Sequence, residues 1–297
     1  MENVLRFNTI SENNAFNKNE TLHPLVSVVD LSKADPRRGS RMYFGFYTVF
    51  LKEVKCGDLT YGRNTYDYQE GTLVFLAPGQ FAGVTNSELY QPKGYALVFH
   101  EDLIHGTALG KHMREYSFFT YETREALHLS DRERQIVLDC FEKIKYELEH
   151  SIDKHGRKLI ASNIELFLNY CQRFYDRQFI TREVAHKGIL GRFDELLNNY
   201  FKSEQTQTIG LPSVAWCAKE LNLSANYFGD LVKKETGRSA QELIHAKIID
   251  LAKERIFDLS KTVSQLSYEL GFKHPAHFTR LFKQKVGVTP NEFRSSN

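Results

Sequence analysis

The chain has 297 residues, of which 39 are Lys or Arg and 37 are Asp or Glu, so its formal net charge is only +2. This length allows two domains that each bury a core, and no apolar run approaches the roughly eighteen residues of a membrane-spanning helix, which excludes a membrane protein. The 4 cysteines are scattered, without a C-x-x-C pair or a signal peptide, so we expect a reduced, cytoplasmic protein.

The first hundred residues are rich in strand-forming side chains. Residues 1–20 carry many Asn and Glu residues, which predicts a poorly ordered or edge segment. From Leu25 to His100 the chain is dense in Tyr, Phe, Val and Thr, and turn signals recur at Cys56–Asp58, Gly62–Asn64, Glu70–Gly71 and Pro78–Gly79. Short strands at this spacing predict a sandwich or barrel over about residues 20–100.

Two longer helices are predicted next, at about residues 130–178. Ser130 and Glu133 have the spacing of a capping box, so the first helix begins there. Apolar residues then recur with a helical period, and Cys140 and Cys171 fall among them, as Cys217 does later, so we expect these thiols to pack in cores. Asp153–Gly156 reads as the loop between the helices. Residues 181–191, which carry charges and two glycines, are predicted to be an interdomain linker.

A helix, a short turn and a second helix are predicted near the end of the chain. Thr262 and Gln265 form a capping pair, and Gly271 ends the helix that follows. Pro275 then favours a new helix start. That helix has one apolar stripe, made of Phe278, Leu281, Phe282 and Val286, and its other side is polar and basic. A recognition helix is presented to the major groove in this way, so the pattern predicts DNA binding.

The same pattern occurs about fifty residues earlier. The aligned pairs, with one residue inserted in the later copy, include Val214 with Val263, Leu221 with Leu270, Phe228 with Phe278, Lys233 with Lys283 and Gly237 with Gly287. Two helix-turn-helix units therefore lie in tandem. A helix begins between them at Ser239, and its seventeen residues from Gln241 to Phe257 span roughly 26 Å, which is compatible with recognition helices about one duplex turn, ~34 Å, apart.

This arrangement, and the motif GFKHPAHFTRLFKQKVGVTPNEFR in particular, resembles the AraC/XylS family of bacterial transcription regulators. The resemblance covers Phe193 to Arg294 and is specific, because it combines two units, a long linker helix, and the spacing F-x-R-x-F-K followed by G-x-x-P-x-x-F-R. It implies an α+β fold of two domains. Residues 1–180 would form a cupin-like barrel with a helical pair, for sensing and dimerisation, and residues 192–297 an all-α domain with two helix-turn-helix units joined by a long helix.

The resemblance also implies which residues contact DNA. In the first recognition helix, Gly229 and Asp230 depart from the usual pattern, because glycine offers no side chain and an acid near phosphates is repelled. We therefore expect the second unit to contribute more of the base reading. The predicted DNA-binding residues are Ser224, Asn226, Tyr227, Asp230, Lys233, Lys234, Lys247, Pro275, Ala276, His277, Arg280 and Lys283.

The predicted barrel and helical pair offer two further candidate sites. Aromatic residues from Tyr43 to Phe50 alternate across a strand, which indicates either a packed core or a ligand pocket; in the second case Arg41, Tyr43 and Tyr47 would hold a small-molecule effector. By the resemblance, the helical pair forms a homodimer, and packing only on its own barrel is the alternative. The candidate interface residues are Ile136, Phe141, Ile164 and Phe167.

No motif of an enzyme or metal site occurs in the sequence. A His-x-His pair with a following Glu, a G-x-S-x-G and a phosphate loop are all missing, so we expect no catalytic residues, no metal and no cofactor. The leading hypothesis is a regulator that binds promoter DNA and a small effector, with RNA polymerase as a further candidate partner. Two alternatives stay open: a regulator without a ligand whose barrel only dimerises, and a metal-free cupin-type isomerase or epimerase.

Overall fold

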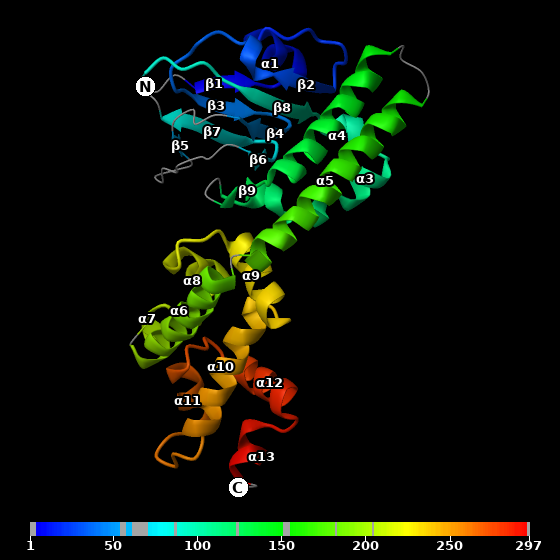
Figure 1. Ribbon diagram of the computed structural model, residues 1–297. Helices are drawn as coiled ribbons and strands as arrows, with labels where there is room; N and C mark the ends of the chain where they lie inside the picture. Colours follow the sequence, from blue (N-terminus) through cyan, green and yellow to red (C-terminus); the bar gives the residue numbers. More distant parts are fainter. Residues whose placement is uncertain are drawn as a thin grey trace. The chain divides into compact units, whose positions relative to one another are not determined.

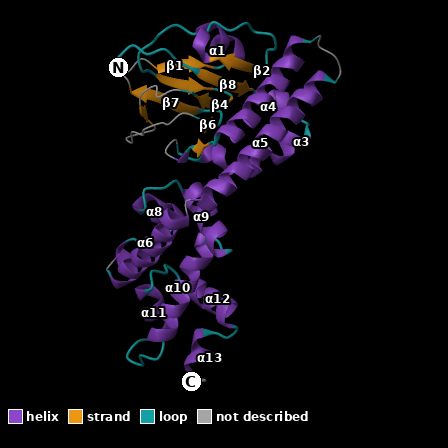
Figure 2. Ribbon diagram, in the orientation of Figure 1, coloured by secondary structure: helices purple, strands orange, loops and turns teal. Residues whose placement is uncertain are grey.

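The computed structural model describes residues 4–53, 58–60, 71–85, 88–122, 125–150, 155–181, 183–203 and 205–295. The chain divides into two compact units, Met1–Thr181 and Arg182–Asn297 (Figure 1). Strands are found in the first unit, whereas the described part of the second is helical (Figure 2), which confirms the α+β prediction at this coarse level. The predicted turns within residues 54–57 and 61–70 lie outside the described residues, as do residues 153 and 154 of the predicted loop at Asp153–Gly156.

The described strands of the first unit form two sheets. One has four strands in the order β1 (Val4–Phe7), β3 (Arg41–Phe44), β7 (Gln80–Thr85) and β5 (Asp58–Thr60), in which β1 and β3 are parallel. The other has five antiparallel strands in the order β2 (Val26–Asp30), β8 (Gly94–Phe99), β4 (Tyr47–Lys52), β6 (Thr72–Leu76) and β9 (Leu127–His128). The predicted β region is therefore present, and its closure as a cupin-like barrel stays a prediction.

The N-terminal segment is more ordered than its composition predicts. Strand β1 does lie at the edge of its sheet, as one of the two predicted alternatives had it. Helix α1 (Ile10–Phe16) follows, and there the prediction was wrong. Thr9 and Glu12 close a capping box, with each backbone N–H donating to the other side chain at 3.2 Å, and Ile10 is only 1% exposed. Local capping and one buried apolar side chain outweigh the polar composition.

The core of the first unit lies between the two sheets. Met42 and Phe44 of β3 face inward with Phe46, and the rings of Phe44 and Phe46 are 6.0 Å apart. The other sheet contributes Val29, Val74, Leu76, Ala96 and Val98 to the same cluster. The inward-facing aromatic side chains of this region therefore pack together as core, which was one of the two alternatives that the sequence left open.

The predicted helical pair is α4 (Asp131–Glu149) and α5 (Gly156–Thr181), and the capping box of Ser130 and Glu133 is confirmed. Both helices pack on the five-stranded sheet: Phe75 of β6 lies 6.1 Å from Tyr175 of α5, ring to ring, and α4 contacts β2. Short elements complete this unit: η1 (Leu31–Lys33), α2 (Glu101–Ile104), α3 (Ala108–His112), η2 (Met113–Glu115) and η3 (Ser117–Thr120).

The second unit consists of helices in its described residues. They are α6 (Glu183–Lys202), α7 (Gln205–Thr208), α8 (Val214–Glu220), α9 (Ala225–Thr236), α10 (Ala240–Arg255), α11 (Val263–Glu269), α12 (Pro275–Val286) and α13 (Pro290–Ser295). Helix α6 occupies most of the stretch 181–191 in which the sequence predicts a linker. Charge and isolated glycines did not prevent a helix there.

Candidate nucleic-acid interface

The two predicted helix-turn-helix units have matching helices. The first helices, α8 and α11, each have 7 residues, and the second helices, α9 and α12, each have 12. Both second helices end at a glycine in the left-handed conformation, Gly237 with φ 70° and Gly287 with φ 93°. The repeat read from the sequence is thus present as a repeated backbone.

Local capping positions the start of each helix. Ser224 accepts a hydrogen bond from the backbone N–H of Tyr227 at 3.2 Å and begins α9. Thr262 and Gln265 close the predicted capping box of α11, with N···O distances of 2.8 and 3.1 Å. Pro275 occupies the first turn of α12, where its missing N–H leaves no helical hydrogen bond unmade. The recognition helices therefore begin where the sequence predicts.

An aromatic core holds the inner face of each second helix. Phe228 of α9 is fully buried and meets Phe193 of α6 with ring centroids 5.0 Å apart. Phe278 and Phe282 of α12 are likewise fully buried, and Phe282 lies 5.5 Å from Phe293 of α13. Because these apolar stripes point inward, the opposite faces of α9 and α12 are turned to solvent.

The outer face of α12 is basic and accessible. Ala276, His277, Arg280 and Lys283 are exposed, and their spacing along the helix places them on one side. Neither Arg280 nor Lys283 forms an ion pair with the described part of the chain. The structure thus brings together the candidates that the sequence assigned to the second unit, and Arg280 keeps its donors available.

The outer face of α9 is different. Asn226, Lys233 and Lys234 are exposed and Asp230 is half-buried, but Tyr227 is only 4% exposed. The prediction that Tyr227 contacts DNA is therefore corrected: its ring belongs to the core of this unit, because burial of an aromatic side chain is favourable. The aligned residue of the second unit, His277, is exposed.

Lys247 also has a place that the sequence did not indicate. It lies on α10, and its Nζ is 3.8 Å from Oδ1 of Asp194 on α6. This ion pair connects α10 to α6, and Lys247 lies on neither α9 nor α12. Its contribution to DNA binding stays a prediction.

Two exposed lysines next to these candidates were not singled out from the sequence. Lys273 stands just before the first turn of α12, where backbone N–H groups attract phosphates, and Lys285 lies in its last turn. Burial, followed by the charge of Lys285, lowers the pKa of His245 on α10, so this lysine also lies near the linker helix. The sequence could have pointed to both lysines, because they stand at the two ends of a helix that is predicted to have a basic face.

Of the three ligand residues predicted in Met1–Thr181, Arg41 and Tyr43 both contact Phe81, whereas Tyr47 lies apart from them. Arg41 and Tyr43 point away from the core formed by Met42 and Phe44, and on that outer face Arg41 lies 4.8 Å from the ring centroid of Phe81. Tyr47 belongs to the other sheet and stacks on Phe99 at 5.1 Å. Alternation along β3 places Arg41 and Tyr43 on one outer face, and Tyr47 lies on the other sheet. The shared pocket predicted for Arg41, Tyr43 and Tyr47 is therefore corrected.

The predicted dimer residues are mostly buried inside the chain itself. Phe141, Ile164 and Phe167 are at most 1% exposed, and the rings of Phe141 and Phe167 lie 5.2 Å apart. They form the contact between α4 and α5, so they are not available to a partner, whereas Ile136 is partly exposed. Among the described residues of this pair, the most exposed large apolar side chains are Tyr146, Leu159 and Leu166, with 60%, 45% and 40% exposure.

The predicted core packing of the cysteines is confirmed for Cys140, Cys171 and Cys217, which are buried free thiols. Burial raises the pKa of Cys217 to about 12, so its thiolate is scarce at neutral pH. Among the described residues, no three His, Cys, Asp or Glu side chains gather as a metal site. Within the same ranges, every helix is too short or too polar to cross a bilayer.

The comparisons with known proteins agree with this geometry. Residues 217–296, from within α8 to the end of α13, match the family model described as a helix-turn-helix domain. The transcriptional regulatory protein YesN of Bacillus subtilis is 34% identical over 85 residues, which cover 28% of this chain and 23% of that protein. The HTH-type transcriptional regulator YobQ of the same organism is 24% identical over 218 residues, 62% of this chain and 88% of that protein.

A solved structure of ToxT from Vibrio cholerae covers 91% of this chain and 97% of its own, at 14% identity and a TM-score of 0.30. The family model shows a helix-turn-helix domain in residues 217–296, in agreement with the AraC-type motif of its second helix-turn-helix unit. The matched relatives are named as transcription regulators, in agreement with the prediction that the chain is not an enzyme.

Proposed function

We propose that this chain is a sequence-specific DNA-binding transcription regulator of the AraC type. The observation that carries the proposal is the exposed basic face of α12, presented by a helix-turn-helix unit that is repeated in the same domain. Double-stranded DNA attracts such a face electrostatically, and an available arginine can donate two hydrogen bonds to O6 and N7 of guanine.

The two recognition helices have different tasks in this proposal. Arg280 and His277 of α12 read base edges, while Lys283, Lys285 and Lys273 hold phosphates. On α9, Asn226 is the side chain suited to reading a base, because its amide can pair with N6 and N7 of adenine, and Lys233 and Lys234 hold phosphates. One chain would then occupy two successive major-groove segments.

The test is selection of genomic DNA fragments by the purified full chain, at stated salt, with Arg280→Ala selected in parallel. We expect the wild type to recover a two-part motif whose halves lie about one duplex turn, 10–10.5 base pairs, apart. We expect Arg280→Ala to lose the half read by α12. Recovery of random fragments by the wild type, with binding that only follows salt, would overturn the proposal.

The finer part of the proposal concerns the first unit, Met1–Thr181. We propose that it binds a small effector and forms a homodimer through the exposed Leu159 and Leu166 of α5, so that the effector shifts which half-sites are occupied together. RNA polymerase would be a further partner. A metabolite screen by thermal unfolding tests the effector, and sedimentation tests the dimer. A single species near the chain mass of 34.5 kDa would contradict the dimer.

A further inference from the structure

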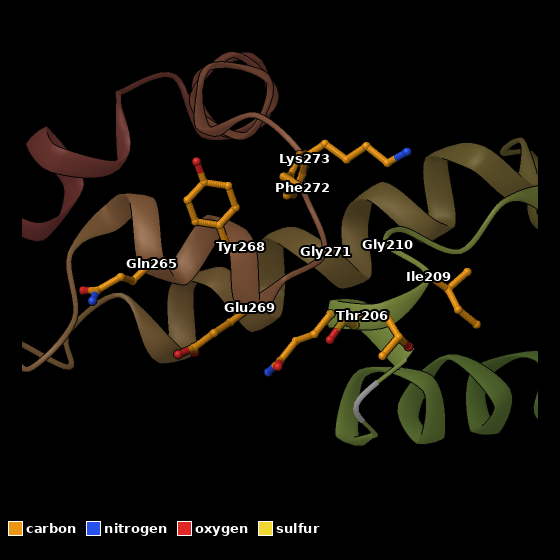
Figure 3. A pocket seen from close by; sticks show the side chains of 11 residues that line it. Thr206, Ile209, Gly210, Gln265, Tyr268, Glu269, Gly271, Phe272 and Lys273 are labelled. Atoms are coloured by element: carbon orange, nitrogen blue, oxygen red, sulfur yellow. The ribbon is translucent and has the colours of Figure 1, made fainter.

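A pocket of about 530 Å³ lies between α11 of the second helix-turn-helix unit and α7, which precedes the first unit (Figure 3). One side of the pocket is lined by α7 and the residues that follow it, including Thr206, Ile209 and Gly210. The other side is lined by α11 and the turn after it, including Gln265, Tyr268 and Gly271. In sequence the two helix-turn-helix units are joined by α10, and the contact between α7 and α11 adds a second connection on the N-terminal side of the first unit. At the edge of the pocket, the backbones of Gly210 and Gly271 come together.

The two glycines are in direct backbone contact. A Cβ on Gly271 would lie 2.9 Å from the carbonyl carbon of Gly210, 3.0 Å from its oxygen and 3.1 Å from the nitrogen of Leu211. Real side chains do not approach backbone atoms so closely, so residue 271 must lack a Cβ for the two backbones to keep this distance.

A buried tyrosine of α6 connects Gly210 to α8, the first helix of the first helix-turn-helix unit. Tyr200 of α6 is 2% exposed, and its hydroxyl donates a hydrogen bond of 2.8 Å to the carbonyl oxygen of Gly210. Its ring packs edge-on against Trp216 of α8, with centroids 4.7 Å apart. A continuous path of contacts, Trp216–Tyr200–Gly210–Gly271, therefore connects α8 to the turn that precedes α12. We call this path the brace.

The first helix-turn-helix unit shows that the turn between the two helices of such a unit does not require glycine. Asn222 occupies the aligned position in the turn between α8 and α9, with φ 60°, and Gly271 has φ 97°. Asparagine tolerates this left-handed conformation. Asn222 is exposed, whereas Gly271 is buried against Gly210. Close approach of the Gly210 backbone, and not backbone conformation alone, is therefore what excludes a side chain at position 271.

We infer that the brace fixes the position of α12 relative to α9, and that Gly271 and Tyr200 are positioning residues which determine the half-site spacing that the domain accepts. The inference rests on the proposed function, in which both helices enter one duplex. A change of one base pair moves the second half-site by about 3.4 Å along the duplex and about 34° around it. A domain held by α10 alone could follow such a change by bending, whereas a braced domain cannot.

The experiment uses the full chain and the two-part motif that it selects. Affinity is measured for the cognate spacing, for spacings longer and shorter by one base pair, and for each half-site alone. Gly271→Asn keeps a residue suited to the left-handed turn and adds the Cβ that the contact excludes. We expect its preference for the cognate spacing to fall about fivefold or more, the lower end of common coupling between sites. Its affinity for each half-site alone should stay unchanged.

Two more variants keep the test decisive. Tyr200→Phe removes only the hydroxyl that anchors Gly210, so it should lower the same preference to a smaller extent, and it carries the test alone if Gly271→Asn does not fold. Asn222→Gly is the matched control in the unbraced turn and should leave the preference as in the wild type. Unchanged spacing preference in both folded variants would overturn the inference. A wild type without any selected motif would instead overturn the proposed function.

Discussion

The first and second helix-turn-helix units have equal helix lengths, but aligned positions on their recognition helices carry different charges. Arg280 and Lys285 of α12 align with Asp230 and Glu235 of α9. Helix α12 therefore carries three basic residues and no acid, while α9 balances Lys233 and Lys234 against two acids. The comparison teaches that buried stripes and terminal glycines preserve the backbone of such a unit, whereas its outer face is free to diverge, here toward unequal shares of DNA recognition.

The largest expected effect tests whether base reading lies in the second unit. Arg280→Ala should cost about 1 to 3 kcal/mol of binding to the selected motif and much less on random DNA, because a bidentate contact to a base is lost. Titration of both DNAs by fluorescence anisotropy measures this. Asp230→Ala at the aligned position is the control and should not weaken motif binding. Equal losses on motif and random DNA for Arg280→Ala would contradict a base-reading role.

The aligned lysines should behave alike, since both are exposed near the end of their helices. Lys283→Ala and Lys233→Ala should each weaken binding to all sequences, and each should make the slope of log K against log salt less steep by about 0.9, because one phosphate contact is lost. Salt titrations on motif and random DNA check this. A loss confined to the motif would show that the lysine reads a base and would sharpen the difference between the units.

Asp230→Asn should strengthen binding to motif and random DNA by up to about 1 kcal/mol, the scale of an exposed charge interaction, because one repulsion with the phosphates is removed. The effect should diminish as salt is raised. Weaker binding by this variant at low salt would show that the carboxylate accepts a hydrogen bond from a cytosine, and the first unit would then read bases as well.

The smallest effect concerns stability and contrasts two glycines. A Cβ on Gly229 of α9 would meet nothing within 4 Å, so Gly229→Ala should stabilise the free protein by about 0.5 to 1 kcal/mol through helix propensity. Gly271→Ala should destabilise it, because the left-handed conformation and the contact with Gly210 both exclude a Cβ. Urea unfolding of each variant against wild type checks the two signs. A destabilising Gly229→Ala would show that α9 is packed more tightly than described.

Much of the C-terminal domain could be predicted because its signals are local. The pairs Ser239 with Glu242 and Thr262 with Gln265 lie three residues apart, so spacing alone identified helix starts that the structure confirms. The repeat was equally accessible, because buried positions recur at a nearly constant offset. The central part of the basic face of α12, with Arg280 and Lys283, followed from the same periodicity, whereas Lys273 and Lys285 at its ends were missed.

The remaining details depend on contacts between distant segments. At Arg41 to Phe44 both strand faces carry an aromatic residue, so alternation could not tell that Met42 and Phe44 face inward. Phe141 and Phe167 lie in apolar stripes that suit a partner helix from another chain as well as from the same one, and here they meet each other. Tyr227 was misassigned for the same reason, since its burial depends on its surroundings and not on its helix position.

Helices α9 and α12 have the same length and end in the same way, so the residues on the outer face of one can be transferred to the other. Both run for 12 residues to a left-handed glycine, and both keep a phenylalanine, Phe228 or Phe278, at the centre of the buried side. Grafting the outward residues of α12 onto α9, with the inward ones left in place, should make the half-site read by α9 resemble the one read by α12. The contact of His277 would not be transferred, because the aligned Tyr227 is buried.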